Sequence, residues 1–353
     1  MKEPIKKFCF RTLLAALPVF LFMALYVIVD PFHIIHPVTT DAQGRDSVMV
    51  SNNAGFTSIE TYLLHDDQYH YDSFIFGSSM SQNFKASYWK PYLDSTASIL
   101  HLDASMETLT GIINKMRFLN RHGTTIKNAL IVIEAEMLGR RPLDDDILHT
   151  QHPATTGALN WINVHARFFN AFRNIDLVKQ ALLPSQHSNG LQQEGIINDI
   201  APNRVDHFNE MYYAEIDSII AVNPSKFFTP ERLAKHKRAT LPTASQPAID
   251  EAVEAQLMTI KHILDENHSR YIIIIPPRAT YPQLKWHDLW VMRAIFGEYK
   301  VHDFSGVPEL VNDQRAYYDK AAHLISAKCK LLLDSAYYEQ RHHSINNPYY
   351  KRH

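Results

Sequence analysis

Serines follow a short apolar run early in the chain, in an arrangement that can support nucleophilic chemistry. The run at 72–76 (DSFIF) has the composition of a strand and leads directly into Gly77, Ser78 and Ser79. A glycine at the carboxyl end of a parallel strand permits a tight turn, and the residues after it lie where open α/β sheets bind ligands. A serine there can expose its hydroxyl and aim its backbone N–H at a developing oxyanion. The alternative is that Ser78, Ser79 and Ser81 only cap a helix.

A carboxylate and an imidazole stand near the other end of the chain, at Asp319 and His323. A serine nucleophile usually takes a histidine as its base, and a carboxylate orients that histidine. The pair follows the last predicted strand, so the serine block and the pair converge on one edge of a doubly wound sheet. A capping aspartate and a surface histidine are the alternative, since the chain has 20 histidines. The joint placement favours a serine, a histidine and an aspartate that act together.

Strand-like apolar runs alternate with helical patterns, which is typical of a parallel sheet covered by helices. The strands are predicted at 73–76, 98–102, 129–134, 271–275 and 300–304. Helices are predicted at 107–120, 160–183, 249–267 and 326–337. The fold class is therefore α/β, a three-layer α/β/α sandwich with a mostly parallel five-stranded sheet in flavodoxin-like order.

The interval between the third and fourth predicted strands is too long for a simple crossover. It runs from 135 to 270 and must contain an insertion, at about 137–248. The insertion is either a lid or substrate-binding subdomain or ordinary decoration of the domain. The resulting division is a cytoplasmic segment at 1–11, a membrane anchor at 12–29, a connecting segment at 30–70, the main domain at 71–340 and a tail at 341–353.

The N-terminal region has the features of an uncleaved membrane anchor. The stretch 12–29 contains no charged residue, and about 20 apolar residues cross the hydrocarbon core as a helix. Basic residues precede the stretch, and none follows it until Arg45. The positive-inside rule then leaves the N-terminus in the cytoplasm and the main domain outside, in the periplasm of a Gram-negative cell. A cleaved signal peptide is the alternative, but its small-residue cleavage pattern is missing before Asp30.

Composition argues against several kinds of partner. The formal net charge is −2, and no basic cluster follows the first residues, so we expect no nucleic-acid partner. The two cysteines, Cys9 and Cys329, should lie in different compartments, and neither has the spacing of a metal site. We expect no metal and no organic cofactor.

The serine block, the Asp/His pair and the anchor together resemble the SGNH (GDSL-like) hydrolase superfamily. The resemblance is strongest to its membrane-anchored, extracytoplasmic members with a G-S-S block, such as the D-alanyl transfer proteins of bacterial cell-surface glycan systems. It implies that Ser79 is the nucleophile, His323 the general base and Asp319 the residue that orients it. The insertion is not covered by the resemblance.

The chain departs from that family's pattern in three places. The closing block is normally D-x-x-H, whereas three residues separate Asp319 from His323. The second-block glycine, an oxyanion donor, has no counterpart, so we expect backbone amides of Asp103, Ala104 and Ser105 to serve with that of Ser79. The third-block asparagine is also missing, because Glu134-Ala135-Glu136 follows the third predicted strand at that point.

Other polar residues offer further chemistry, each with a structural alternative. His149 and His152 could form a metal pair, but a solvated loop beside the acidic run 144–146 is favoured. Glu134 and Glu136 could act as an acid/base pair, or could form ion pairs with Arg140 or Arg141. Arg278 follows the fourth predicted strand at the ligand edge, where it would bind an anionic substrate group or belong to a turn.

The expected function is a membrane-anchored serine esterase or O-acyltransferase that acts on cell-surface carbohydrate through an acyl-enzyme. Its partners would be a glycan or acyl donor, the membrane and envelope-biosynthesis proteins. The alternative is a catalytically inactive SGNH fold that binds glycan or partner proteins in an envelope assembly, which the missing glycine and asparagine blocks favour.

Overall fold

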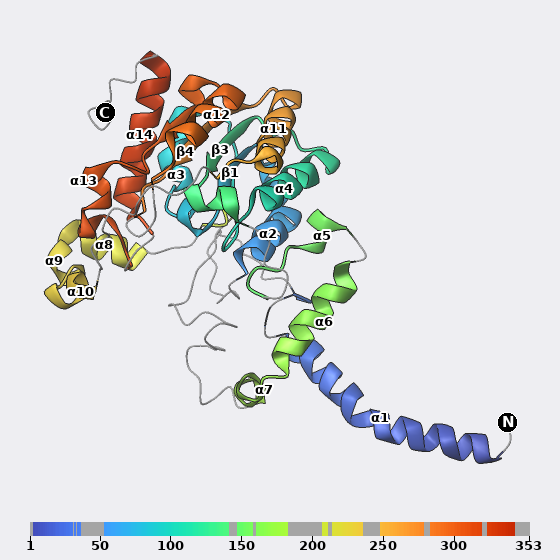
Figure 1. Cartoon of the computed structure of the whole chain (residues 1–353). Helices are drawn as coiled ribbons and strands as arrows, with labels where there is room; N and C mark the ends of the chain where they lie inside the picture. Colours follow the sequence, from blue (N-terminus) through green and yellow to red (C-terminus); the bar gives the residue numbers. More distant parts are fainter. Residues whose placement is uncertain are drawn as a thin grey trace.

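A five-stranded, all-parallel sheet forms the centre of the molecule (Figure 1). The computed structural model describes residues 3–30, 32, 34–36, 53–140, 147–157, 160–182, 207–210, 214–235, 248–278, 283–319 and 323–342. The strands are β1 (Ser73–Gly77), β2 (Ile99–Asp103), β3 (Asn128–Val132), β4 (Arg270–Ile275) and β5 (Val301–Asp303). They lie in the order β2-β1-β3-β4-β5, the flavodoxin-like order. The predicted fold class is confirmed, and every predicted strand overlaps an observed one.

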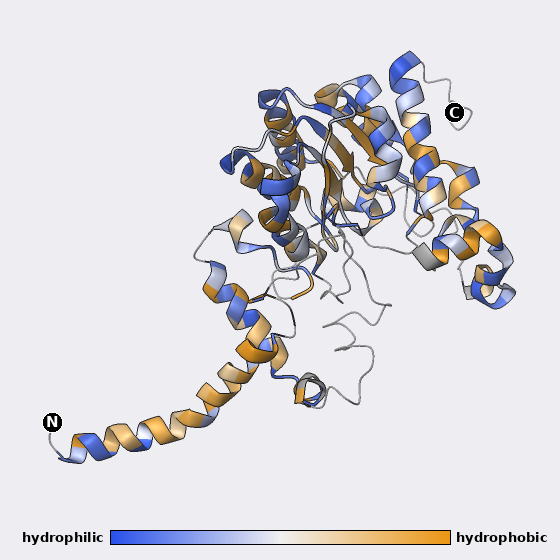
Figure 2. Ribbon diagram, turned by 180° about the vertical axis from the view of Figure 1, so that it is seen from behind, coloured by the Kyte–Doolittle hydropathy of each residue, from blue (hydrophilic) through white to orange (hydrophobic). Residues whose placement is uncertain are grey.

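Side chains alternate between the two faces of the sheet because successive residues of a strand point in opposite directions. On β1, Phe74 and Phe76 face one helical layer, and Ile75 faces the other. The first layer contains α2 (Ala54–Tyr69), α4 (Leu109–Arg121), α11 (Glu251–Glu266) and α12 (Trp286–Phe296). The second contains α3 (Ala86–Trp89), α13 (Pro308–Val311) and α14 (Ser326–His342). Figure 2 shows the apolar strands enclosed between these layers.

The prediction of a single helix at 160–183 is wrong. The structure has two helices there, α6 (Asn160–Phe172) and α7 (Ile175–Leu182). The Asn174 side chain accepts a hydrogen bond from the Asp176 backbone N–H at 2.9 Å. Asparagine competes for backbone donors in this way, so it begins a new helix rather than continuing the old one.

The end of the predicted connecting segment belongs to the main domain. Helix α2 buries Ile59 and Tyr62 against the sheet. Its N-cap residue, Asn53, accepts from the Phe56 amide and donates to the carbonyl groups of Ile147 and Thr150. These contacts fix the start of the domain near residue 53, while 37–52 lies outside the described residues.

Helix α1 (Glu3–Val29) is long and apolar enough to cross a membrane. Its best 18-residue window has a mean hydropathy of 2.5 and is 6% buried. The end of α1 packs against α6, where the Phe22 and Phe172 rings are 5.4 Å apart and the Tyr26 and Phe169 rings 5.5 Å apart. Helix α1 therefore contacts the domain through α6.

The described part of the insertion contains two groups of helices. The first contains α5 (Pro153–Thr156), α6 and α7, on the side of α1 (Figure 1). The second contains α8 (Ala214–Val222), α9 (Pro224–Phe227) and α10 (Pro230–Lys235). The second group forms a small core with Tyr318 and Ile325, next to the start of α14.

Candidate active site

The turn after β1 separates the roles of its serines. Ser78 is the N-cap of a short 3-10 helix (Ser79–Ser81), and its Oγ accepts from the Met80 amide at 3.1 Å. The Ser81 hydroxyl donates to the Ser78 carbonyl at 2.7 Å. A Cβ on Gly77 would lie 2.8 Å from the Ser81 Cβ, so the turn closes tightly only because this residue is glycine. Ser78 and Ser81 thus perform the capping, and Ser79 remains half-buried with its hydroxyl directed elsewhere.

The hydroxyl of Ser79 lies against His323. The Ser79 Oγ is 2.8 Å from His323 Nε2, and His323 Nδ1 is 2.5 Å from Asp319 Oδ2. The His323 backbone N–H also donates to Asp319 Oδ1 at 3.1 Å. The distance from Ser79 to His323 lies within the range expected of a nucleophile and its base, and the shorter distance from His323 to Asp319 puts the carboxylate in direct contact with the imidazole. The structure therefore brings together the three residues that the sequence singles out.

The residues on either side of 320–322 pair with each other and bring Asp319 and His323 together. Tyr317 and Leu324 form an antiparallel bridge, and the Tyr318 amide donates to the His323 carbonyl at 2.8 Å. Asp319 and His323 therefore follow and precede two paired segments. This pairing keeps the Asp319 carboxylate beside the His323 imidazole, although three residues separate them in the sequence.

Solvent reaches this group of side chains. The side chain of His323 is 33% exposed and that of Asp319 is 47% exposed. A substrate could thus approach the Ser79 hydroxyl from outside without a change in the core. Such access is required of a serine nucleophile, whereas a buried structural serine lacks it.

Tyr318, the neighbour of Asp319, is held by the insertion. Arg232 of α10 donates to the Tyr318 carbonyl at 2.9 Å, and the Tyr318 hydroxyl donates to Asp217 of α8. Asp217 also accepts from Ser326 at 3.0 Å and from Lys85 at 2.5 Å. Burial raises the pKa of the Tyr318 phenol, so it stays a donor. No local pattern in the sequence indicates this contact, because its partners lie about 100 residues apart.

The amides after β2 are not equally available for an oxyanion. The Ala104 N–H donates to the Gly77 carbonyl at 3.1 Å, which extends the sheet by one residue. The Asp103 side chain is buried and accepts from Gln82 at 3.0 Å, and burial raises its pKa. The Ala104 amide is therefore engaged within the sheet, and the Asp103 side chain has a structural role. In the part of the chain that the structure describes, the backbone N–H groups of Ser79 and Ser105 have no hydrogen-bond partner, and these two remain as candidate donors.

Two arginines bind the carboxylates that follow β3. Glu134 accepts from Arg140 at 3.1 Å and from Arg278 at 3.3 Å, while its other oxygen accepts from Ser78. Glu136 accepts from Arg140 at 3.3 Å and from Arg278 at 2.5 Å. The predicted pairing with Arg140 is confirmed, and Arg141 lies outside the described residues.

Arg278, expected either to bind an anionic substrate group or to belong to a turn, pairs with the two carboxylates after β3. Its guanidinium group forms ion pairs with both Glu134 and Glu136, and the cavity beside it has a volume of about 10 Å³. That is about the room needed for a single water. Through Glu134 and Ser78, this ion-pair cluster supports the turn that presents Ser79.

The described residues contain no group of three or more His, Cys, Asp or Glu side chains that could hold a metal ion. His152 uses both ring nitrogens, one with Glu60 at 2.7 Å and one with the Ala154 amide at 3.1 Å. A metal pair with His149 is thus not formed, and the acidic run 144–146 lies outside the described residues.

Comparison with known proteins adds no assignment to this geometry. No protein-family model matches the chain, and no curated protein sequence is significantly similar to it.

Proposed function

We propose that this protein is a membrane-anchored serine esterase or O-acyltransferase of the SGNH type, acting on cell-surface carbohydrate. The observation that carries the proposal is the unbroken hydrogen-bonded series from Ser79 Oγ through His323 to Asp319. The series stands at the carboxyl edge of a sheet in flavodoxin-like order, where such folds bind their ligands. Serine, histidine and aspartate in this relation perform acyl transfer on unrelated folds.

The geometry supports the following reaction. The Ser79 Oγ attacks the acyl carbonyl carbon while its proton passes to His323 Nε2. The carbonyl oxygen becomes an oxyanion, which the N–H groups of Ser79 and Ser105 would stabilise. The tetrahedral intermediate then expels the alcohol, which takes the proton from His323. Water or an acceptor hydroxyl attacks the acyl-serine in the same way, and Ser79 recovers its proton.

The anchor supports a location for this reaction. Helix α1 is long and apolar enough to span a membrane, and basic residues precede its uncharged stretch. The positive-inside rule then favours an extracytoplasmic main domain. Cell-surface glycans and envelope-biosynthesis proteins are the partners available at that face.

Hydrolysis of p-nitrophenyl acetate by the purified full chain tests the proposal. We expect Ser79→Ala to lower the rate by about 10³-fold or more. Ser95→Ala, which removes an exposed hydroxyl away from the site, should leave the rate unchanged. An inactive wild type, or a Ser79→Ala variant as active as wild type, would overturn the proposal.

A second candidate function, a non-catalytic glycan-binding or assembly protein, is favoured by one observation. The position that follows β3 holds Glu134, an ion-paired carboxylate, where an oxyanion-donating side chain would serve catalysis. A full chain that binds glycan but hydrolyses no ester would support this function instead.

A further inference from the structure

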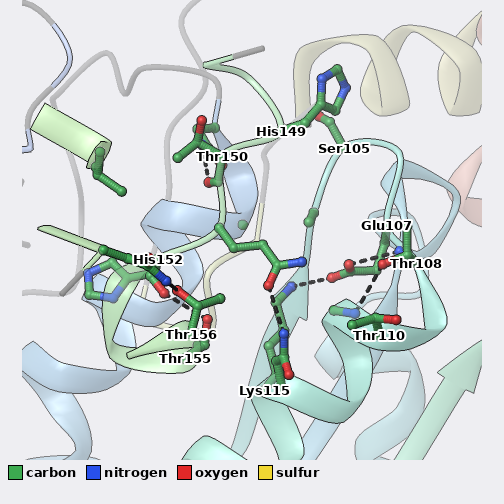
Figure 3. Close-up of a pocket in the computed structure, with 18 of the residues that line it drawn as sticks. Ser105, Glu107, Thr108, Thr110, Lys115, His149, Thr150, His152, Thr155 and Thr156 are labelled. Carbon is green, nitrogen blue, oxygen red and sulfur yellow. Dashed lines mark hydrogen bonds and ion pairs between the residues drawn. The ribbon is translucent and has the colours of Figure 1, made fainter. Parts of the chain in front are cut away.

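A cavity of about 400 Å³ lies beside the loop that follows β2 (Figure 3). Its walls come from that loop, the first turns of α4, the segment 149–156 and α6. Its volume falls within the range of about 300–1,000 Å³ that is typical of small-molecule sites. The ion-pair cluster at Arg278 has no comparable space, so this cavity is the better candidate for a bound ligand.

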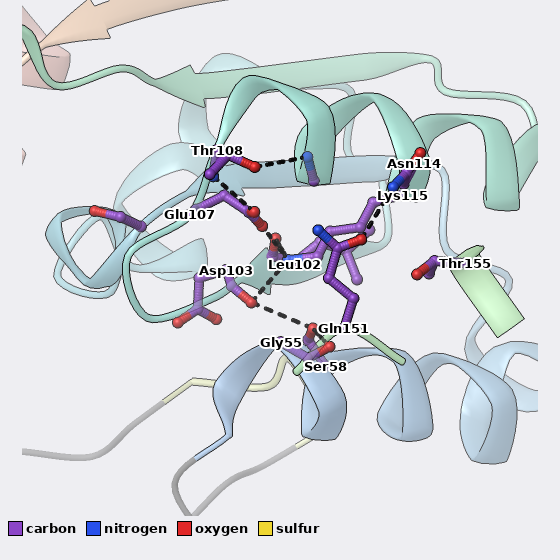
Figure 4. Close-up of polar contacts among 12 residues, drawn as sticks. Gly55, Ser58, Leu102, Asp103, Glu107, Thr108, Asn114, Lys115, Gln151 and Thr155 are labelled. Atoms are coloured by element: carbon purple, nitrogen blue, oxygen red, sulfur yellow. Dashed lines mark hydrogen bonds and ion pairs between the residues drawn. The ribbon is translucent and has the colours of Figure 1, made fainter. Parts of the chain in front are cut away.

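Hydroxyl and amide groups predominate in the lining, which includes Ser105, Thr110, Asn114, Gln151, Thr156 and Asn163. Asn114 donates to Gln151 at 2.9 Å, which fixes both amides in the wall (Figure 4). Each amide retains further donors and acceptors. A wall of this kind suits a ligand rich in hydroxyl groups, such as a saccharide.

The buried lysine in the cavity wall contributes no free charge. Lys115 Nζ donates to Glu107 at 2.6 Å and to the carbonyl groups of Leu102 and Asp103 at 2.8 and 2.9 Å. Its three donors are therefore used within the protein. Figure 4 shows this ammonium group enclosed by its partners. The Lys115–Glu107 ion pair carries no net charge and shapes the wall of the cavity.

Arg167 supplies the cationic group that remains. It lines the cavity from α6 and is half-buried. Within the described ranges, its guanidinium group has neither an ion pair nor a hydrogen bond. Arginine matches the geometry of a carboxylate or a phosphate, and a partly buried guanidinium without an anion favours such a ligand.

The cavity also lies between the catalytic edge and the anchor. Ser105 lines it from the loop after β2, the strand next to β1 and its nucleophile turn. On the other side, Val164 lines the cavity and belongs to the apolar cluster in which α6 meets Tyr26 of α1. A ligand in this position lies beside the loop after β2, where Ala104 bonds to Gly77 of the serine turn, and beside α6, which contacts α1.

We propose that this cavity binds an acidic saccharide, a sugar unit that carries one carboxylate or phosphate group, with Arg167 pairing that group. The claim that Ser79 acts on this saccharide rests on the proposed function. The claim that the cavity binds the saccharide does not.

Binding to the detergent-solubilised full chain tests the proposal, measured by calorimetry on the Ser79→Ala variant so that no turnover occurs. The probes are glucuronate, glucose 1-phosphate and glucose. We expect one or both acidic sugars to bind at least about tenfold more tightly than glucose, as a charge-assisted contact requires. The carboxylate and phosphate arms show which anion the site prefers.

Variants in α6 and just after it make the test specific. Arg167→Gln should remove the preference for acidic sugars, and Asn163→Trp should block all binding by filling the cavity from an exposed position. Arg173→Gln, an exposed arginine on the same side of the insertion, should bind like its parent. Equal affinity for glucose and the acids, or unchanged binding in Arg167→Gln, would overturn the proposal. If acidic sugars bind to a chain that has no esterase activity, the binding site is supported and the proposed function is refuted. If the chain has esterase activity but does not bind acidic sugars, the proposed function is supported and the binding site is refuted.

Discussion

His323 uses each of its ring nitrogens for a separate task. Since Asp319 at 2.5 Å accepts the proton on Nδ1, Nε2 carries a lone pair toward the Ser79 hydroxyl at 2.8 Å. The second oxygen of Asp319 accepts a hydrogen bond from the His323 backbone N–H. The carboxylate therefore fixes both the tautomer and the position of the imidazole.

Asp319→Asn tests this role. The amide keeps the shape of the side chain, but its NH₂ group favours the opposite tautomer of His323, in which Nε2 is protonated. We expect the turnover number for p-nitrophenyl acetate to fall by about 10³- to 10⁴-fold, with an unchanged melting temperature. Wild-type turnover in this variant would show that Asp319 does not orient the base.

At the scale of elements, the second group of insertion helices contacts the segment that holds Asp319, whereas the first group lines the cavity. Helices α8 and α10 bind Tyr318 through Asp217 and Arg232. Since Tyr318 immediately precedes Asp319, these helices determine where the carboxylate stands. The second group of insertion helices is thus part of the support of the site rather than a separate decoration.

Asp217→Ala should loosen this support. The Tyr318 and Ser326 hydroxyls would each lose their carboxylate acceptor and keep each other, and Lys85 would lose its ion pair, at a cost of about 1–3 kcal/mol. We expect a decrease of about tenfold or more in the turnover number, with a smaller change in KM. Asp176→Ala, a matched change on the exposed face of α7, should have no effect. Equal turnover in the two variants would contradict a positioning role.

Helices and strands could be predicted where the pattern of neighbouring residues determines them. The aliphatic run of β4 and the helical period of α11 each follow from a few adjacent residues, because both are packed by repeating apolar positions. The choice of Ser79 over Ser78 came from family resemblance, and the structure gives its physical reason in the cap formed by Ser78.

Other parts of the site depend on contacts between distant segments and could not be read from the sequence. The Ala104 amide donates a hydrogen bond to the Gly77 carbonyl, and only the register of β1 and β2 reveals this contact. The support of Tyr318 by Asp217 and the charge of Arg167 in a cavity likewise arise from packing across the insertion. No periodicity encodes such pairings.

For the whole molecule, helix α1 and the domain are joined through aromatic contacts between α1 and α6. The two natural cysteines allow the orientation to be tested. Cys9 is exposed on α1, whereas Cys329 is fully buried in α14, where burial raises the pKa of its thiol and suppresses its reactivity.

A membrane-impermeant maleimide applied to right-side-out vesicles should therefore leave the wild-type chain unlabelled until the vesicles are opened. Ser95→Cys, an exposed position on the main domain, should be labelled at once. Labelling of Cys9 in sealed vesicles, with Ser95→Cys protected, would place the domain in the cytoplasm.

The central claim is that Ser79 is an activated nucleophile, and its most direct test is reaction of the full chain with a fluorophosphonate probe. The modified peptide is then identified by mass spectrometry. We expect a single adduct on Ser79, formed more slowly in Asp319→Asn and missing in Ser79→Ala. An adduct on another serine, or equal labelling of wild type and Ser79→Ala, would contradict the claim.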